Sequence, residues 1–220
     1  MRMQDQTTII IADDHPLFRT ALSVTLQQVI PHSHIIESED LTSLQTCVEK
    51  HNQASMILLD LHMPGADGFS ALIFLLAHYP NIPVIVVSAH DEPEIIRRAL
   101  DFGACGFLSK SAATQTMKEA LNTVFNGGIW APEGVSLDRV VGNEEQSIAD
   151  ALASLTPQQF RVASMVSQGL LNKQIAFELD VTEATVKAHM TEIFKKLDVH
   201  SRTQVALALS QLAISPEPLA

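Results

Sequence analysis

The sequence of 220 residues predicts a doubly wound α/β domain followed by a small all-α domain. The first part alternates short apolar, β-branched runs with amphipathic stretches, which is typical of a (βα)5 fold with a parallel five-stranded sheet. The last part has only helical periodicity, with signals for four helices. Between them, glycine, proline and acidic residues interrupt the periodicity. We therefore expect domains at 7–126 and 154–214, joined by a linker at 127–153.

Five apolar runs predict the strands of the first domain, and each run precedes a candidate helix. Three of them, at 9–11, 57–59 and 84–87, lack polar alternation, which predicts central strands buried on both faces. The expected strands are 8–12, 34–37, 55–59, 83–88 and 105–108. The expected helices are 16–29, 41–50, 68–78, 92–102 and 112–126.

Helix-start signals divide the second domain into four helices. Thr156, Pro157 and Gln159 have the spacing of a capping box with proline at the first helical position, and this helix should end near residue 169. The next helices are expected at 173–179 after the cap Asn172, at 183–197 after the cap Thr182, and from the cap Ser201 to about residue 212. Because a short turn joins the second helix to the third, the pair should form a helix-turn-helix.

Composition and charge limit the classes of function. The net charge of −11 argues against a chain that binds nucleic acid along its whole length. The acidic excess lies in the first domain and the linker, whereas residues 154–220 are neutral. Cys47 and Cys105 fit no metal or redox spacing, and the apolar runs are too short to span a bilayer. Without a signal-peptide pattern, we expect a cytoplasmic protein that binds no membrane.

Five polar side chains follow the predicted strands at their carboxyl ends, where sites form in open parallel sheets. They are Asp13, Asp14, Asp60, Ser88 and Lys110. Crowded carboxylates repel one another unless a cation neutralises them, and hard oxygen ligands with open positions suit Mg²⁺. A carboxylate beside Mg²⁺, with a lysine nearby, can attack a phosphoryl group and hold it as an acyl phosphate. Each residue alone could instead be a helix cap, a turn former or a surface lysine.

The segments ADDHPLF, DLHMPGADG, VSAH and GACGFLSK resemble the receiver domain of bacterial response regulators, and the resemblance covers residues 7–126. It implies that Asp60 is the phosphoacceptor. It also implies an Mg²⁺ site in which Asp14 binds directly and Asp13 largely through water. Asp60 and the backbone carbonyl of His62 would complete the protein ligands.

The same resemblance assigns the remaining residues of the pocket. Ser88 would hydrogen-bond one phosphoryl oxygen, and Lys110 would pair with another. Phe107 matches the switch aromatic, which turns inward when Ser88 moves toward the phosphate. The other histidines of this domain show no ligand spacing, so ordinary surface or core roles are expected for them.

The second domain resembles the LuxR-type DNA-binding domain through its LTP start and the runs QGLLNKQIA, TVKAH and KKL. Together with the receiver, this resemblance identifies the chain as a member of the NarL/FixJ family of response regulators. The third helix would enter the major groove of double-stranded DNA. The expected DNA contacts are Lys173, Thr182, Thr185, Lys187, Ala188, Thr191, Lys195, Lys196 and Arg202.

These contacts divide into base and backbone roles. Lys187 could reach a guanine edge or a phosphate, and the amides of the helix start at Thr182 could bind a phosphate. Two positions depart from the family pattern: Gln159 replaces a frequent glutamate, and Thr191 replaces a frequent basic residue. Because this domain is neutral, a monomer should bind DNA weakly and a dimer should be required.

The resulting hypothesis is a transcriptional regulator of a two-component system, not an enzyme. A sensor histidine kinase, or acetyl phosphate, would phosphorylate Asp60. Phosphorylation would then free the third tail helix or promote a homodimer that binds an inverted repeat. Three alternatives stay open: a phosphohydrolase with Asp60 as nucleophile, an adaptor whose tail binds protein, and a regulator that acts without phosphorylation.

Overall fold

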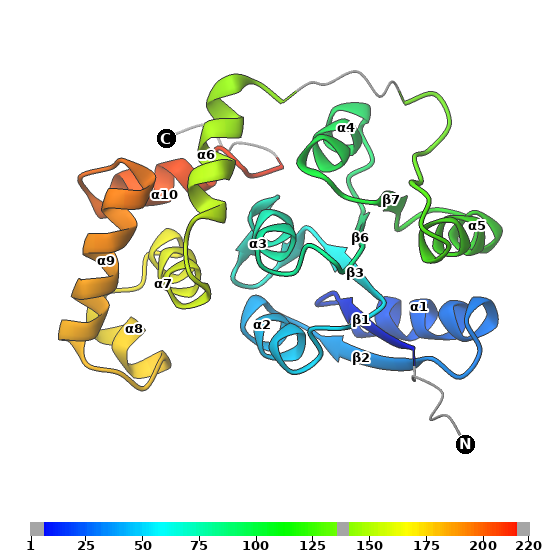
Figure 1. The fold of residues 1–220 in the computed structure, drawn as a ribbon, viewed down its shortest axis with the longest axis horizontal. Coiled ribbons are helices and arrows are strands. Elements are labelled where there is room, and N and C mark those ends of the chain that lie inside the picture. Colours follow the sequence, from blue (N-terminus) through cyan, green and yellow to red (C-terminus); the bar gives the residue numbers. More distant parts are fainter. Residues whose placement is uncertain (1–6, 136–140, 215–220) are drawn as a thin grey trace.

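The computed structural model describes residues 7–135 and 141–214, and it contains the expected parallel sheet with the strand order β2-β1-β3-β6-β7 (Figure 1). The strands are β1 (Thr8–Ala12), β2 (His34–Ser38), β3 (Met56–Asp60), β6 (Val84–Ser88) and β7 (Gly106–Ser109). All neighbouring strands pair in parallel. The three runs without polar alternation form the central strands, so the predicted fold class is confirmed.

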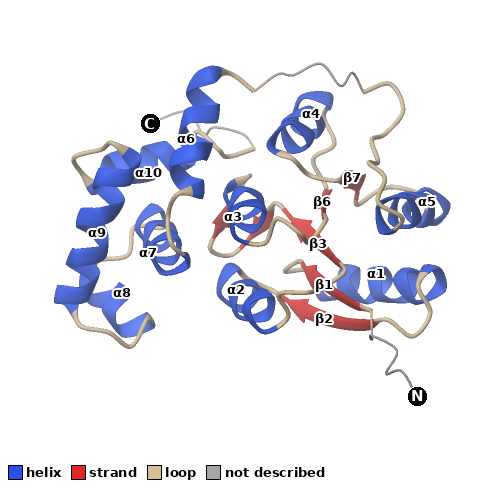
Figure 2. Cartoon of the chain, in the orientation of Figure 1, coloured by secondary structure: helices blue, strands red, loops and turns tan. Residues whose placement is uncertain are grey.

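Helices cover both faces of this sheet (Figure 2). One face carries α1 (Pro16–Val29) and α5 (Thr114–Phe125), and the other carries α2 (Leu41–Lys50), α3 (Ser70–His78) and α4 (Pro93–Phe102). Successive strand residues enter opposite cores: Ile9 and Ile11 lie in the core under α1 and α5, whereas Ile10 lies in the other core.

A small hairpin follows β3, which the sequence analysis did not predict. It consists of β4 (His62–Met63) and β5 (Ala66–Asp67), paired antiparallel. Gly65 in its turn has φ +84° and Gly68 after it has φ +55°, both in the left-handed region that glycine adopts without strain. Helix α3 consequently begins at Ser70, two residues later than expected.

The second part of the chain is helical, as predicted. Its helices are α6 (Asn143–Ala153), α7 (Pro157–Ser167), α8 (Asn172–Glu178), α9 (Glu183–Leu197) and α10 (Arg202–Ser210). Helix α6 occupies the second half of the expected linker, and residues 136–140 of that linker lie outside the described residues. Across the described ranges, no helix is both long and apolar enough to cross a membrane.

Three of the four predicted helix caps are present. In each, the side-chain oxygen accepts a hydrogen bond from the backbone N–H three residues later, at 3.2 to 3.3 Å. These caps are Thr156, Thr182 and Ser201. The predicted cap Asn172 is wrong, because Asn172 is the first helical residue and Leu171 occupies the cap position. Leucine offers no side-chain acceptor for the first helical turn, and the side chain of Gln174 reaches back to accept a hydrogen bond from the Leu171 N–H at 2.8 Å.

The two domains pack against each other through α3, α6 and α7. Phe74 of α3 stacks on Phe160 of α7, with ring centroids 4.6 Å apart and an interplanar angle of 13°. His78 Nε2 lies 2.9 Å from the carbonyl oxygen of Leu155 at the start of the second domain. A continuous set of buried apolar side chains therefore extends from one face of the sheet into the helical domain.

Candidate functional site

A charged cluster lies at the carboxyl end of the sheet, centred on Asp60, the last residue of β3. The Asp60 and Asp13 side chains are almost fully buried, and Lys110 Nζ lies 2.7 Å from Asp60 Oδ2 and 2.8 Å from Asp13 Oδ2. The Lys110 ammonium also lies 5.1 Å from the centre of the Phe18 ring on α1. Parallel pairing places β1 beside β3, so carboxylates 47 residues apart meet at one edge.

Burial and neighbouring charges shift the pKa values of Asp60 and Lys110 in opposite directions. Burial raises the pKa of the Asp60 carboxyl, and the Lys110 ammonium partly opposes that increase. Burial alone would lower the pKa of Lys110, but hydrogen bonds and attraction from Asp13 and Asp60 raise it overall. A protonated lysine between two carboxylates is therefore the stable arrangement of this cluster.

The donor set fits a hard divalent cation. Among the described residues, Asp13 Oδ2 and Asp14 Oδ1 are buried oxygens without a well-formed hydrogen bond. Asp13 Oδ2 lies 2.8 Å from Lys110 Nζ, and Asp14 Oδ1 lies 2.6 Å from His15 Nδ1. Ligand atoms of Asp13, Asp14, His15 and Asp60 all lie within 4.8 Å of one another. Carboxylate oxygens collected in this way are the ligands that Mg²⁺ prefers.

The hydroxyl and the aromatic residue of the pocket are both buried. Ser88 ends β6 and its Oγ accepts a hydrogen bond from the His90 N–H at 3.1 Å. Its carbonyl oxygen accepts from the Lys110 N–H at 2.8 Å, which ties the ends of β6 and β7 together. The side chain of Phe107 on β7 is fully buried, so in this state the aromatic ring already faces inward.

Three histidines surround the pocket: the sequence analysis placed His62 there through its backbone carbonyl, but it missed His15 and His90. The His62 N–H donates to Asp60 Oδ1 at 3.1 Å, and the His62 ring lies 4.9 Å from the His90 ring. Burial, followed by repulsion from His90, lowers the pKa of His62. His15 contacts the carboxylates directly. Each histidine immediately follows a strand-end site residue or lies two positions after it, which is the signal that could have revealed them.

The second domain forms one wall of a cavity beside this pocket. The cavity has a volume of about 730 Å³ and separates the receiver-side loops from α7 and α10. Its lining includes Asp14, His62 and His90 on one side and Ser167, Ser210 and Ala213 on the other. The loop that follows Asp60 therefore faces both the charged cluster and the helical domain.

Hydrogen bonds to backbone carbonyl oxygens hold that loop against the helical domain. The Ser164 hydroxyl on α7 donates to the Gly65 carbonyl oxygen, and the Phe69 N–H donates to the Leu212 carbonyl oxygen at 2.9 Å. A Cβ atom at Gly68 would collide with the Leu212 carbonyl oxygen, so only glycine permits this approach.

Arg98 on α4 joins three segments of the interface. Its guanidinium donates to Glu145 Oε1 of α6 at 2.5 and 3.0 Å, and to the carbonyl oxygens of Gln211 and Ala213 at 3.3 and 3.2 Å. It also stacks over the Phe69 ring at 4.6 Å. Helix α4 is thereby tied to both α6 and the end of α10.

The predicted DNA-reading face of α9 is exposed. Packing buries Val186, Met190 and Ile193 on the inner face, whereas Lys187, Ala188 and Thr191 face outward. The α9 helix packs mainly on α6, α7, α8 and α10, and in Figure 1 α7 lies between α9 and the sheet domain. In this arrangement the sheet domain does not cover the start of α9.

The predicted DNA-contacting cations differ in their surroundings. Lys173, Lys187 and Lys195 are exposed. Lys196 Nζ instead donates to the Ser154 carbonyl oxygen at 2.7 Å and to Gln159 Oε1 at 2.8 Å, and Arg202 donates to the Leu170 carbonyl oxygen. Glutamine at position 159 serves both the helix cap and Lys196.

Comparison with known proteins gives consistent matches over both domains. Residues 9–122 match the response regulator receiver domain, and residues 153–209 match the bacterial regulatory proteins of the luxR family. The chain is 38% identical over 210 residues to the glycerol metabolism activator of Pseudomonas putida, covering 93% of this chain and 95% of that protein. It is 29% identical to the nitrate/nitrite response regulator protein NarL of Escherichia coli K12, covering 96% and 98%.

Solved structures match over the same length. RcsB from Salmonella enterica serovar Typhimurium, bound to a promoter in the presence of phosphomimetic BeF₃⁻, is 28% identical with a TM-score of 0.55. This similarity covers 95% of this chain and 100% of that chain. A structure of two RcsB dimers bound to two parallel DNAs is 27% identical with a TM-score of 0.56, covering 95% and 100%.

Proposed function

The chain belongs to the NarL/FixJ-type response regulators, phosphorylation-dependent transcription regulators with a receiver and a LuxR-type domain, and from this premise we propose that Asp60 is its phosphoacceptor. The observation that carries the proposal is the buried contact of Lys110 with both Asp60 and Asp13. A buried carboxylate at a strand end is costly unless a cation and a reaction use it.

The transfer step follows from these contacts. A carboxylate oxygen of Asp60 attacks the phosphorus of a phosphohistidine on a sensor kinase, or of acetyl phosphate. The bond from phosphorus to the donor breaks, the donor leaves with its electron pair, and an acyl phosphate remains on Asp60. Lys110 pairs with a phosphoryl oxygen, and the Ser88 hydroxyl donates to another.

Asp13, Asp14, Asp60 and the His62 carbonyl would hold Mg²⁺ in this pocket. When bound, Mg²⁺ would neutralise the carboxylates and the negative charge of the transferring phosphoryl group. Without that neutralisation, the Asp13 and Asp14 carboxylates would repel the incoming phosphate. The protein residues orient the acceptor, and Lys110 keeps its charge beside it.

The conformational change caused by phosphorylation would pass from the pocket to α4 through Ser88 and Phe107. Movement of Ser88 and Lys110 toward the phosphate would shift the paired ends of β6 and β7, and the adjoining α4 with them. Because Arg98 of α4 holds α6 and the end of α10, that shift would weaken the contact between domains. Since α9 already faces outward, the main effect we propose is release of the helical domain for pairing, not uncovering of α9.

Dimerisation would compensate for the weak electrostatic attraction between a single helical domain and DNA. A neutral domain has few phosphate contacts, so two copies on an inverted repeat are needed for useful affinity. Lys187, Ala188 and Thr191 would face base edges, while Thr182, Thr185, Lys173 and Lys195 would lie near the backbone. We propose a cytoplasmic protein that forms a DNA-binding homodimer when phosphorylated and does not turn over a substrate.

The test is recovery of fragmented genomic DNA on the purified protein, with and without acetyl phosphate and Mg²⁺, beside the Asp60→Asn variant. Enrichment of fragments sharing an inverted repeat by the treated wild type alone would support the proposal. Equal enrichment by Asp60→Asn would favour regulation without phosphorylation, and no enrichment in any state would favour a protein-binding adaptor. Steady hydrolysis of a phosphate ester that Asp60→Asn abolishes would favour the phosphohydrolase.

A further inference from the structure

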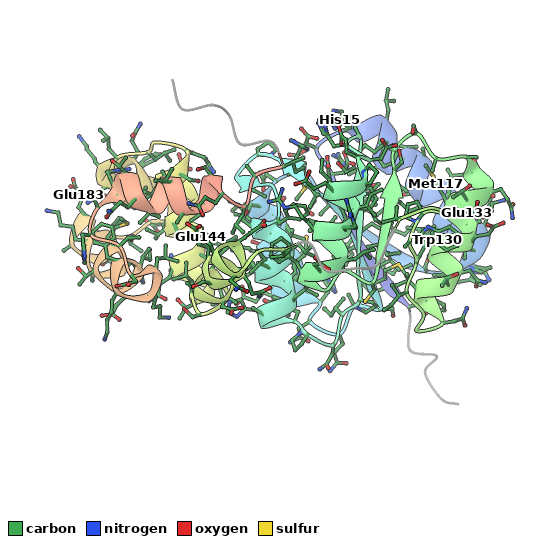
Figure 3. The ribbon with its side chains drawn as sticks, turned by 90° about the horizontal axis from the view of Figure 1, so that it is seen from above. His15, Met117, Trp130, Glu133, Glu144 and Glu183 are labelled. Atoms are coloured by element: carbon green, nitrogen blue, oxygen red, sulfur yellow. The ribbon has the colours of Figure 1, made fainter. Side chains whose placement is uncertain are left out.

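His15 is a nitrogen donor placed among the carboxylates of the proposed metal site. Its Nδ1 lies 2.6 Å from Asp14 Oδ1 and 3.3 Å from Asp13 Oδ1. The ring is about two-thirds exposed, so it is not required to fill the core. Figure 3 shows His15 at the margin of the receiver half of the molecule, well away from Glu183 on the helical domain.

The local sequence fixes the position of this histidine. Proline at position 16 restricts the backbone of His15 to extended conformations, and the observed angles are φ −92° and ψ 104°. The His15 N–H donates to Asp13 Oδ1 at 2.7 Å, which locks the turn that ends β1. The imidazole is therefore held beside the two carboxylates by backbone geometry and not by side-chain packing.

The spacing suits a single shared ion. A divalent cation with ligands at about 2.1 Å holds donor atoms no more than about 4.2 Å apart. The ligand atoms of Asp13, Asp14, His15 and Asp60 all lie within 4.8 Å of one another, so small side-chain movements toward a common centre would bring them onto one ion. Asp14 Oδ1, the oxygen nearest to the imidazole, is also a buried atom without a well-formed hydrogen bond.

We propose that His15 Nδ1 is a direct ligand of the metal in this pocket, giving the site one nitrogen among its oxygens. The inference rests on the proposed function, because it assumes that the pocket around Asp60 binds a divalent cation. Nitrogen ligands favour first-row transition cations over Mg²⁺, and affinity rises along the series from Mn²⁺ to Ni²⁺. The pocket therefore accepts Mg²⁺ but binds Co²⁺ more tightly than an all-oxygen site of the same geometry does.

The experiment uses full-length protein without a polyhistidine tag, loaded with Mn²⁺. Pulsed electron paramagnetic resonance detects the hyperfine coupling of a directly bound imidazole nitrogen. The variants are His15→Asn, which keeps a hydrogen-bonding side chain before the proline, and His90→Asn, a matched control with an exposed imidazole beside the same pocket. Displacement of bound Mn²⁺ by Mg²⁺ or Co²⁺ gives the affinities of both ions.

Wild type and His90→Asn should show the nitrogen coupling, and His15→Asn should lose it. The Co²⁺ affinity of His15→Asn should fall by about tenfold, with the Mg²⁺ affinity changed by less than about twofold. Mn²⁺ bound without nitrogen coupling in wild type, or coupling that persists in His15→Asn, overturns the inference and leaves the proposed metal site intact. If wild type binds no Mn²⁺, or if Asp60→Asn binds Mn²⁺ as tightly as wild type does, both the inference on His15 and the proposed metal site are overturned.

Discussion

The pocket around Asp60 and the exposed face of α9 contain the same kinds of side chain in opposite surroundings. In the pocket, two buried carboxylates each lie within 2.8 Å of the Lys110 ammonium. On α9, Lys187 and Thr191 point into solvent, and charges of both signs cancel over the domain. The pocket is organised for a small ligand before one arrives, whereas the helix face is incomplete until a second copy and DNA are present.

The largest effect is expected at Asp60, the proposed phosphoacceptor. Asp60→Asn keeps the shape of the side chain but removes the nucleophilic oxygen, so phosphorylation by acetyl phosphate should fall by at least about 1000-fold. The extent of phosphorylation is measured by the incorporation of labelled phosphate from acetyl phosphate into the protein. The exposed acid Glu92, changed to Gln, is the control and should react like wild type. Substantial phosphorylation of Asp60→Asn would place the acceptor elsewhere.

The second effect contrasts two phenylalanines of the helical domain. Phe160 is fully buried and stacks on Phe74, whereas Phe177 on α8 is 83% exposed. Phe160→Ala should lower the free energy of unfolding by about 3–5 kcal/mol, because it leaves a cavity between the domains. Phe177→Ala should change it by less than about 0.5 kcal/mol. Urea denaturation measures both, and equal effects would show that the domains do not share a core in solution.

The third effect tests whether α4 holds the domains together. Arg98→Met removes the hydrogen bonds to Glu145 and the end of α10, which should weaken the closed arrangement by about 1–3 kcal/mol. Hydrogen exchange at the Phe69 amide, which is bonded to Leu212, should accelerate accordingly. Arg97→Met is the matched control, because Arg97 Nε bonds to Pro93 of its own helix. The same acceleration in both variants would contradict the proposed role.

The smallest effect is expected on the DNA side. Lys187→Ala should weaken binding of the phosphorylated protein to an enriched fragment by about tenfold, through loss of a base or phosphate contact. Fluorescence anisotropy at several salt concentrations measures it, and a shallower salt dependence would identify a phosphate contact. Lys196→Ala should act mainly through stability, since its ammonium is bonded to Ser154 and Gln159. If Lys187→Ala binds like wild type, α9 does not read DNA through this residue.

Sequence patterns predicted the parts of the structure that depend on local periodicity. Continuous apolar runs identified β1, β3 and β6 as central strands, and the meeting of Asp13, Asp60 and Lys110 then followed from the rule that sites form at the carboxyl ends of parallel strands. The capping box at Thr156 was also predictable, because both of its hydrogen bonds lie within four residues.

Features that depend on distant segments were not predictable from one sequence. Phe74 and Phe160 each fit an ordinary helix core, and nothing in either pattern indicates that they stack on each other. The contact of His15 with Asp14 depends on side-chain direction at a turn, which periodicity does not describe. The cap predicted at Asn172 failed because the helix begins one residue earlier than expected, which makes Asn172 the first helical residue and Leu171 the cap position.

The missing side chain at Gly68 limits how the two domains can separate. Its backbone lies so close to Leu212 that a Cβ atom at this position would collide with the Leu212 carbonyl oxygen, so the close approach exists only while residue 68 is glycine. Movement of this segment away from Gly68 would break the hydrogen bond from the Phe69 N–H to the Leu212 carbonyl oxygen, and would weaken the Arg98 contact to Ala213 beside it. If these contacts break together, each molecule would be either closed or released, and a graded stimulus would change the fraction of molecules that is released.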